Sequence, residues 1–399
     1  MRWLVGLNFN YKFRAIYVGN KVNRAVLAAT VISVLLFSLT AAMSPASGAE
    51  NFWAIKASMH FSRTGAGAAA VNGIVYVIGG SQRYNTSDTG FSYMSINSTE
   101  AYDPATDTWV EKAPMPTSRD GLGVAAFQGK IYCFGGRNVS KDYSISINVT
   151  EVYDTETNSW ETKTPNPTAR SGLQASEVGG KIYLIGGWIE SESSSITEKS
   201  AQVEIYDPVT DTWATGSPIP TAVAGYASAV LDGKIYVISG VASGSTRTNL
   251  TQIYDPKTDE WSLGVAIPMS VSSAAAGSTA GLNAAKAIYV IGGSNDAYPL
   301  NGQLANQVYF PETDSWFMAA QMPVDRAGLA LAVINDTIFV MGGGHNIFTM
   351  DSTTVMQYTP LVNPIIEKEP FPTTLIVASV ITVTVVGVVL VVYFKKRKR

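Results

Sequence analysis

An arginine stands ten residues after a tryptophan at four places in this chain. The four are Arg63, Arg119, Arg170 and Arg326. At the same distance from two further tryptophans the chain has Val223 and Val271 instead. A guanidinium group is a rigid fork of N–H donors that binds a carboxylate at two points. Such a series can hold an acidic ligand, or it can pair with acidic residues of the chain itself.

Six tryptophans set the spacing of these positions. They are Trp53, Trp109, Trp160, Trp213, Trp261 and Trp316. A pair of small residues, usually Gly-Gly, follows each tryptophan after 26 residues in five cases and after 31 in the other. Five of the six tryptophans also follow a tyrosine by seven residues. A self-similar period near 50 residues indicates a repeat architecture, in which these aromatic residues pack between units.

The second repeat shows what each unit contains. Residues 124–127 and 130–134 are short apolar runs that flank the turn signal Gln128-Gly129. Two such runs around a glycine-containing pair predict a β-hairpin. After a polar stretch, the runs at 149–154 and 159–161 predict two more strands. Four short strands per unit at this period are what a β-propeller blade needs.

The repeats resemble those of the kelch family. The matching pieces are the glycine pair after the second strand, a Met-Pro-x-x-Arg segment and a Tyr-Asp-Pro-x-Thr-Asp-x-Trp run. The last of these is nearly complete at 102–109 and at 206–213. The resemblance covers roughly residues 51–360 and implies an all-β fold, a kelch-type β-propeller.

Trp53 decides the expected number of blades. The last repeat contains Tyr358, but Ile365 stands seven residues later, where a tryptophan is expected. The missing tryptophan is at the other end of the chain, since Trp53 has the usual distance to the first glycine pair. We therefore expect residues 51–56 to complete the last blade and close a six-bladed propeller over residues 50–360. Closure removes the exposed sheet edges of a linear array.

In kelch domains, which these repeats resemble, ligands bind on the face that carries the second-to-third-strand connections and the linkers between blades. The resemblance places the arginine position and the residues after the glycine pair there. The latter are Ser81, Arg137, Trp188, Val241, Ser294 and, in the last repeat, Gly344 with His345. An arginine-edged pocket would suit a carboxylated peptide or an acidic sugar. Alternatively, the arginines pair with repeat acids or line a wet central channel.

The connection from Ser81 to Ile96 is the longest of its kind in the repeats and carries Tyr84 and Tyr93. Aromatic side chains exposed on such a loop are candidate contact residues. The alternative is a loop without a binding role.

The residue inventory gives little support to catalysis. The chain has two histidines, His60 and His345, and one cysteine, Cys133, in an apolar run. These numbers exclude a His-rich metal centre, and we expect neither a metal nor a cofactor. The sequence favours a cell-surface binding, adhesion or scaffold module for a protein or glycan ligand. The resemblance leaves one alternative open, a metal-free ectoenzyme acting on acidic sugars, similar to bacterial kelch-type sialic-acid epimerases.

Both ends of the chain predict membrane targeting. Residues 1–49 join a basic leader to an apolar run, the pattern of a signal peptide or an uncleaved N-terminal anchor. After a Pro-rich stalk at 361–374, residues 375–394 carry no charge. As a helix they would span about 30 Å, the thickness of the hydrocarbon core of a lipid bilayer. The basic residues 395–399 predict a cytoplasmic tail, and hence a single-pass cell-membrane protein with its propeller outside.

Six Asn-x-Ser/Thr sequons agree with an extracytoplasmic propeller. They are Asn85, Asn97, Asn138, Asn148, Asn249 and Asn335. Such sites can carry glycan, although chance can also produce them in a chain rich in Asn, Ser and Thr. Residues 50–394 hold all 31 acidic residues but only 18 of the 28 basic ones, a net charge of about −13. An acidic propeller is a poor nucleic-acid binder.

Overall fold

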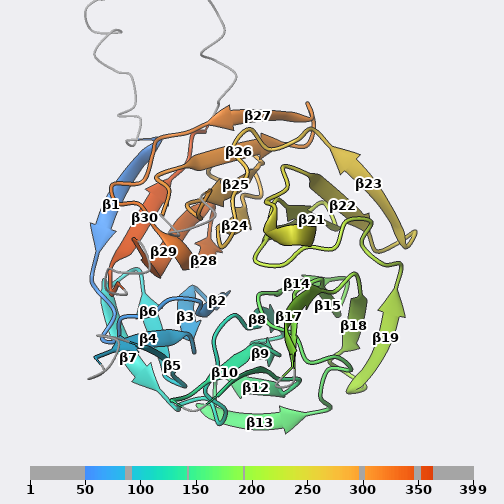
Figure 1. Ribbon diagram of the computed structural model, residues 1–399. Helices are drawn as coiled ribbons and strands as arrows, with labels where there is room; N and C mark the ends of the chain where they lie inside the picture. The colour runs from blue at the N-terminus through green and yellow to red at the C-terminus, as the bar shows by residue number, and fades with distance from the viewer. Residues whose placement is uncertain are drawn as a thin grey trace, which may run out of the picture. The chain divides into compact units, whose positions relative to one another are not determined.

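The computed structural model describes residues 50–85, 92–141, 143–191, 194–295, 302–345 and 352–362. Within them the chain forms six four-stranded antiparallel sheets around a common centre (Figure 1). The outermost strand of each sheet lies on the rim of this ring, at β1, β7, β13, β19, β23 and β27. The predicted all-β, six-bladed propeller is therefore confirmed.

Blades 1 to 3 follow one another along the chain, each running from the centre to the rim. Blade 1 consists of β2 (Gly67–Val71), β3 (Ile74–Ile78), β6 (Thr99–Asp103) and β7 (Thr108–Lys112). Blade 2 consists of β8 (Gly123–Phe127), β9 (Lys130–Phe134), β12 (Thr150–Asp154) and β13 (Ser159–Lys163). Blade 3 consists of β14 (Gln174–Val178), β15 (Lys181–Ile185), β18 (Val203–Asp207) and β19 (Thr212–Gly216).

Blades 4 to 6 complete the ring, and the last one takes its outer strand from the other end of the chain. Blade 4 consists of β20 (Ala227–Leu231), β21 (Lys234–Ile238), β22 (Thr251–Asp255) and β23 (Glu260–Gly264). Blade 5 consists of β24 (Ala275–Ser278), β25 (Ile288–Ile291), β26 (Asn306–Phe310) and β27 (Ser315–Met318). Blade 6 consists of β28 (Ala327–Ile334), β29 (Thr337–Gly344), β30 (Val355–Thr359) and β1 (Phe52–Lys56).

The second strand of every blade is the centre of its core. Its residues are mostly apolar and buried on both faces, as in Ile74–Ile78 and Lys234–Ile238. The innermost strands are rich in alanine and glycine because neighbouring sheets converge near the axis. A side chain at Gly67, for example, would place its Cβ 2.1 Å from Val124 of the next blade. Small residues there allow the blades to pack at the density of a protein interior.

The closure of the ring follows the expectation from Trp53. Strand β1 pairs antiparallel with β30, and Trp53 lies opposite Tyr358. Their ring centroids are 4.9 Å apart, and each of the other five blades has the same tyrosine–tryptophan pair at 4.9–5.2 Å. The aromatic repeat is therefore a cross-strand pair between the third and fourth strands, and the sixth pair joins the two ends of the propeller.

A closed ring of backbone hydrogen bonds surrounds the axis. In each blade an arginine or valine stands ten residues after a tryptophan. The residue two positions further on donates its N–H to the equivalent carbonyl of a neighbouring blade, at 2.7–2.8 Å. The six members are Gly65, Gly121, Gly172, Gly225, Ser273 and Gly328, all with φ between 55° and 67°. Glycine adopts this left-handed backbone without strain, which explains five of the six residues. The bond from Gly65 to Gly328 closes the circle.

The predicted membrane segment at 375–394, the tail at 395–399 and residues 1–49 lie outside the described residues, as does all of the stalk beyond Val362. In the part of the chain that the structure describes, no helix is long and apolar enough to cross a membrane.

Candidate ligand-binding face

Antiparallel strands give the propeller two different faces. We call one the hairpin face, because it carries the second-to-third-strand connections and the linkers between blades. Three of these connections form extra two-stranded hairpins. They are β4 (Ser81–Tyr84) with β5 (Ser92–Ser95), β10 (Arg137–Val139) with β11 (Ser144–Ser146), and β16 (Trp188–Ser191) with β17 (Ser194–Lys199). The opposite face, which we call the turn face, carries the remaining turns of each blade.

Both ends of the propeller leave from the turn face. The chain enters at the start of β1 and leaves after β30, two antiparallel neighbours whose ends meet there. The backbone N–H of Val362 donates to the Glu50 carboxylate at 3.0 Å, and Leu361 accepts a hydrogen bond from Ala285 at 2.9 Å. The hairpin face is therefore opposite to the point where residues 1–49 and the stalk connect to the propeller.

Three of the four arginines of the series lie inside the blades. Arg63, Arg119 and Arg170 have 0–1% of their surface exposed. Each forms an ion pair with an acid on the third strand of its own blade: Arg63 with Glu100, Arg119 with Glu151 at 2.9 Å, and Arg170 with Glu204 at 2.6 Å. Other N–H groups of these arginines donate to carbonyls such as Gly79 and Val149, while the Nε atoms of Arg119 and Arg170 have no hydrogen-bond partner among the described residues. These guanidinium groups are enclosed by the protein and are not exposed to a ligand. For these three arginines the alternative interpretation, pairing with acids of the repeats, is the one that the structure shows.

Blades 4 and 5 replace both members of this ion pair at once. Val223 and Val271 occupy the arginine position, and Gln252 and Gln307 occupy the acid position. Each glutamine accepts from and donates to the backbone of one residue of the preceding linker, at 2.8–3.1 Å. Arginine with glutamate and valine with glutamine are thus two alternative ways to satisfy the same buried position.

Arg326, in blade 6, follows neither pattern. The acid position of its blade is Met356, a buried side chain without a charge. Arg326 is only partly buried, and it donates from Nη2 to Ser352 Oγ at 3.0 Å. Its Nε has no hydrogen-bond partner among the described residues. Burial lowers the pKa of Arg326, while neighbouring Asp325 opposes that shift. Of the four arginines, this one therefore remains at the hairpin face.

Arg247 brings a second guanidinium group to the same region. It comes from the β21–β22 connection of blade 4, after the short 3₁₀ helix η1 (Ser243–Ser245). Its Nε donates to Ser272 Oγ at 3.0 Å and its Nη2 to Ser294 Oγ at 3.5 Å. Sequence reasoning missed Arg247 because the second-to-third-strand connections differ in sequence and length from blade to blade.

These contacts define a cationic patch across blades 4 to 6, which we call the arginine sector. It consists of Arg247, Ser272, Ser294, Arg326 and Ser352. Ser272 and Ser294 exchange backbone hydrogen bonds at 2.8–2.9 Å, and isolated bridges link Ser294 to Gly302 and Gln303 to Arg326. The three serines are buried, at 0–8% exposed, so their hydroxyls support the arginines from below. These hydrogen bonds restrict the orientation of the two guanidinium groups, which are charged donors of the kind that bind carboxylates.

The other predicted face residues lie on blades 1 to 3 or beside the sector. Arg137 forms a two-point ion pair with Asp120 at 3.2 Å. Lys199 stands over the ring of Trp188 at 4.5 Å, a cation–π contact between the strands of one hairpin. Ser81 is buried and exchanges backbone hydrogen bonds with Thr64.

The loop aromatics and His345 are more accessible. Tyr84 and Tyr93 are partly buried on β4 and β5, opposite Ser92 and Arg83. His345 is 46% exposed and pairs through Nδ1 with Asp325, next to Arg326. The structure therefore brings His345, Ser294 and Arg326 close to one another, while Arg137, Trp188 and the two tyrosines lie on the opposite half of the face.

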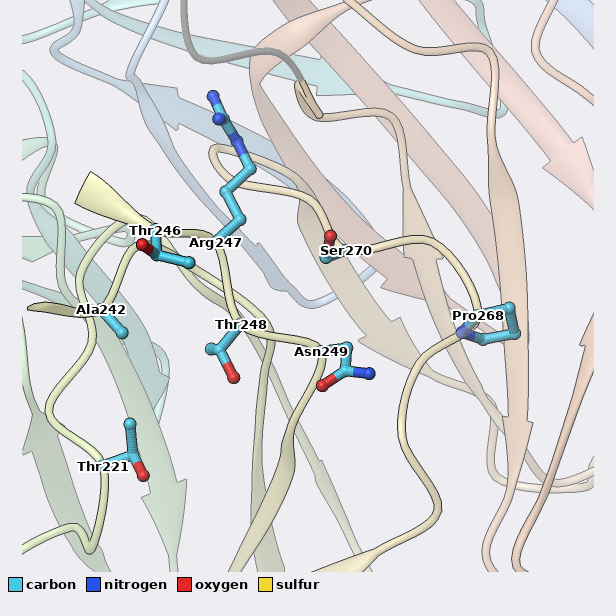
Figure 2. A pocket seen from close by; sticks show the side chains of 8 residues that line it. All are labelled: Thr221, Ala242, Thr246, Arg247, Thr248, Asn249, Pro268 and Ser270. Atoms are coloured by element: carbon cyan, nitrogen blue, oxygen red, sulfur yellow. The ribbon is translucent and has the colours of Figure 1, made fainter. Parts of the chain in front are cut away.

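Two hollows lie at equivalent places in blades 4 and 5. The first has a volume of about 550 Å³. Figure 2 shows its lining residues, which are Thr221, Ala242, Thr246, Arg247, Thr248, Asn249, Pro268 and Ser270. The second has a volume of about 490 Å³ and includes Met269, Leu304 and Asp325. Residues 221 and 269, and residues 249 and 304, occupy the same repeat positions. We call the first one the blade-4 hollow.

Five of the six sequons lie on the hairpin face. Asn85 and Asn138 belong to the hairpins, and Asn97, Asn148 and Asn249 directly precede third strands. Asn335 is in the β28–β29 turn, on the turn face. All six asparagines are partly or fully exposed.

Neither a metal cluster nor a reactive thiol marks a catalytic centre in the described ranges. No group of three or more His, Cys, Asp or Glu residues there could hold a metal ion. Cys133 is completely buried, and burial raises the pKa of its thiol to about 12. It is a core residue of blade 2.

Comparison with known proteins decides the family. The sequence profile of the KLHDC2/KLHL20/DRC7 Kelch-repeats domain matches residues 65–293, more than half of the chain. The chain belongs to the kelch-repeat family. This agrees with the tyrosine–tryptophan pair found in each blade and with the glycine pairs found in five of the six.

Individual relatives of this kelch protein are distant. It is 26% identical to beta-scruin of Limulus polyphemus over 71% of this chain and 31% of that protein. It is 26% identical to mouse Kelch-like protein 35 over 48% of this chain and 29% of that protein. The matches thus span about a third of these relatives' length. The solved structure of YjhT shares the fold with a TM-score of 0.62 at 18% identity, covering 75% of this chain and 95% of that one.

Proposed function

We propose that this kelch protein is a binding or scaffold module presented outside the cell membrane, with a hairpin face that takes a carboxylated protein or glycan ligand through its arginine sector. The observation that carries the ligand class is Arg326. The other three arginines of the series have an acid on the third strand of their own blade, whereas Met356 occupies the acid position in the blade of Arg326. A ligand carboxylate supplies the missing partner.

The electrostatics of the face favour a specific acidic group over general attraction. The stretch 50–394 is strongly acidic, at about −13, so an acidic ligand is repelled from most of the surface. Arg247 and Arg326 form a local exception, held in place by buried serine hydroxyls. A ligand with one or two carboxylates therefore gains most at this sector, which gives selectivity.

Presentation at the membrane rests on the ends of the propeller. The contact between Glu50 and Val362 places the entry and exit of the chain side by side on the turn face. If residues 375–394 span the bilayer, the stalk joins the turn face to the membrane and leaves the hairpin face directed outward. This arrangement is the one that a receptor or adhesion module needs, because partners approach the hairpin face without obstruction from the bilayer.

The test is a screen of the full-length protein in detergent against arrayed acidic glycans and carboxylated peptides, followed by NMR of the best ligand with the protein. We expect saturable binding and an unchanged ligand spectrum over hours. Conversion of a bound sugar would instead establish the alternative, an ectoenzyme acting on acidic sugars. Binding that prefers uncharged over carboxylated members of the array would contradict the proposed ligand class.

A further inference from the structure

The sequon at Asn249 lies in the wall of the blade-4 hollow. Figure 2 shows Asn249 beside Thr248, across the hollow from Pro268 and Ser270. The Asn249 side chain is exposed, and it makes no hydrogen bond to any residue that the structure describes. Its carboxamide is therefore available as an attachment point.

The backbone around this asparagine is firmly held. The Asn249 carbonyl accepts a hydrogen bond from Ile267 at 2.9 Å, and the Thr251 hydroxyl donates to the Val265 carbonyl at 2.9 Å. Asn97 and Asn148 have the same backbone position in blades 1 and 2, where their carbonyls accept from Met115 and Asn166 at 2.8 and 3.0 Å. Three of the six sequons thus share one repeat position, fixed between a third strand and the next linker.

The chemistry of the hollow matches a sugar ring. Four of its eight lining residues carry a hydroxyl group: Thr221, Thr246, Thr248 and Ser270. A hydroxyl both donates and accepts, which suits the ring hydroxyls and acetamido group of a sugar. Pro268 adds an apolar surface, and a volume of about 550 Å³ lies within the range of small-ligand pockets. In Figure 2 the Arg247 side chain points away from Thr221, and its Nε donates to Ser272 Oγ at 3.0 Å.

We propose that Asn249 carries an N-linked glycan and that its first sugar lies in the blade-4 hollow. In this modification the Asn249 amide nitrogen forms a bond to the anomeric carbon of a sugar on a lipid diphosphate donor. The bond between that carbon and the phosphate oxygen breaks, the lipid diphosphate leaves, and the amide nitrogen loses one proton. Transfer to the nascent chain precedes folding, so the later burial of Thr251 does not prevent it.

This inference rests on the proposed placement of the propeller outside the membrane, and it deepens that proposal. A sugar held against Thr221, Thr248 and Ser270 would border the arginine sector on its blade 4 side. The ligand would then reach Arg326 from blades 5 and 6, where the described residues contain no hairpin-face sequon. The glycan would in this way restrict the direction of approach to the sector.

The test uses an amidase that cleaves the sugar–asparagine bond and converts the asparagine to aspartate. The full-length protein is isolated from cells that carry it natively and treated without denaturation, and conversion is followed by mass spectrometry at Asn249 and at Asn148. Both asparagines are exposed and occupy the same repeat position, so Asn148 is the matched control. We expect cleavage at Asn249 to be at least about tenfold slower than at Asn148, and equal at both sites after denaturation.

Filling the hollow provides the second arm. In Ser270→Trp the indole would displace the sugar, and we expect Asn249 to be cleaved as fast as Asn148. Circular dichroism first establishes that this variant is folded. Free N-acetylglucosamine added to Asn249→Gln should slow hydrogen exchange at residues 246–249, and unchanged exchange at saturating sugar would argue against a sugar-binding hollow.

Equal native cleavage rates at Asn148 and Asn249 would overturn the seated sugar. A modified Asn148 with an unmodified Asn249 would overturn the inference and leave the extracellular placement intact. If all six sequons are unmodified, the inference fails, and the placement outside the membrane is then decided by the labelling of intact cells.

Discussion

The indole N–H of Trp53 donates to the carbonyl of Ala320 at 2.8 Å, and the N–H of Ala320 donates to Asn51 at 2.7 Å. One backbone unit of blade 5 is thus held at both of its polar groups by the strand that enters the propeller first. Every blade repeats this clamp. In each one, a single residue of the preceding blade donates its N–H to an Asp or Asn two positions before the tryptophan, and its carbonyl accepts from the tryptophan indole. The six blades are therefore fastened in a ring without a gap.

We predict that Trp53→Ala lowers the stability of the propeller by about 3 kcal/mol, because it removes the pairing with Tyr358 and the bond to Ala320. Asn51→Ala should lower it by about 1 kcal/mol through the lost bond to the Ala320 N–H. The measurement is urea unfolding followed by fluorescence. Phe52→Ala, at a position 38% exposed on the same strand, is the control and should change little. Equal effects at Phe52 and Trp53 would argue against the clamp.

The buried arginines allow a prediction about compensation. Arg119→Val leaves Glu151 charged and unpaired inside blade 2 and should destabilise the protein by about 3–5 kcal/mol. Arg119→Val combined with Glu151→Gln copies the arrangement of blades 4 and 5 and should recover most of that loss. Thermal unfolding of the two variants makes the comparison. Lys163→Met, which breaks the exposed pair with Glu161, should have almost no effect. A double variant no more stable than Arg119→Val would refute the equivalence of the two arrangements.

Asp336 makes stability depend on pH. Burial alone would raise the pKa of this carboxyl group, but hydrogen bonds from the backbone of Ala280, Asn283, Leu282 and Ala284 hold its pKa below the usual value. A depressed pKa in the folded protein stabilises it above the unfolded value near 3.9, and this contribution is lost as pH falls through the folded pKa.

Asp336→Asn should therefore lower the thermal midpoint at pH 7, and the difference from the wild type should narrow below about pH 4. Scanning calorimetry from pH 3 to pH 7 measures both. Glu161→Gln, at an exposed acid, serves as the control for a change in net charge. A gap between wild type and Asp336→Asn that is constant with pH would exclude the carboxylate as its source.

Much of the fold was predictable because it is encoded locally. The tryptophans, tyrosines and glycine pairs recur at nearly fixed distances in the sequence. In five blades the tyrosine and the tryptophan lie on adjacent strands that are consecutive in the chain. Closure was predictable for the same reason, since Trp53 lacked a tyrosine seven residues before it and Tyr358 lacked a tryptophan. The clamp on Ala320 was not predictable, because it joins positions of two different blades that only the folded ring brings together.

The site was predicted less well, for a physical reason. The ten-residue distance from a tryptophan predicts which repeat position an arginine occupies, but it does not predict whether the guanidinium group points into the blade. The signal was present: Glu100, Glu151 and Glu204 occur in the repeats that carry the buried arginines, and Met356 occurs in the repeat of Arg326. Arg247 gave no such signal, because the sequence and length of this connection vary from blade to blade.

Orientation at the membrane can be measured with introduced cysteines. Tyr143 on the hairpin face and Leu282 on the turn face are 50% and 73% exposed. If the turn face is directed toward the bilayer, a bulky impermeant maleimide added to intact cells should label Tyr143→Cys several times faster than Leu282→Cys. A small impermeant maleimide should label both at similar rates, and native Cys133 is buried. Faster labelling at position 282 with the bulky reagent would reverse the proposed orientation.

The most direct test of the account is the binding of the best carboxylated ligand from the array to Arg326→Gln and to Lys141→Gln, measured by calorimetry with the full-length protein. Both variants remove one positive charge from the hairpin face, and Lys141 is exposed in blade 2, far along the ring from the arginine sector. We predict that Arg326→Gln weakens binding by at least about tenfold and that Lys141→Gln changes it less than about twofold. Equal losses in the two variants, or no loss at Arg326, would contradict the central claim that this unpaired arginine binds the ligand.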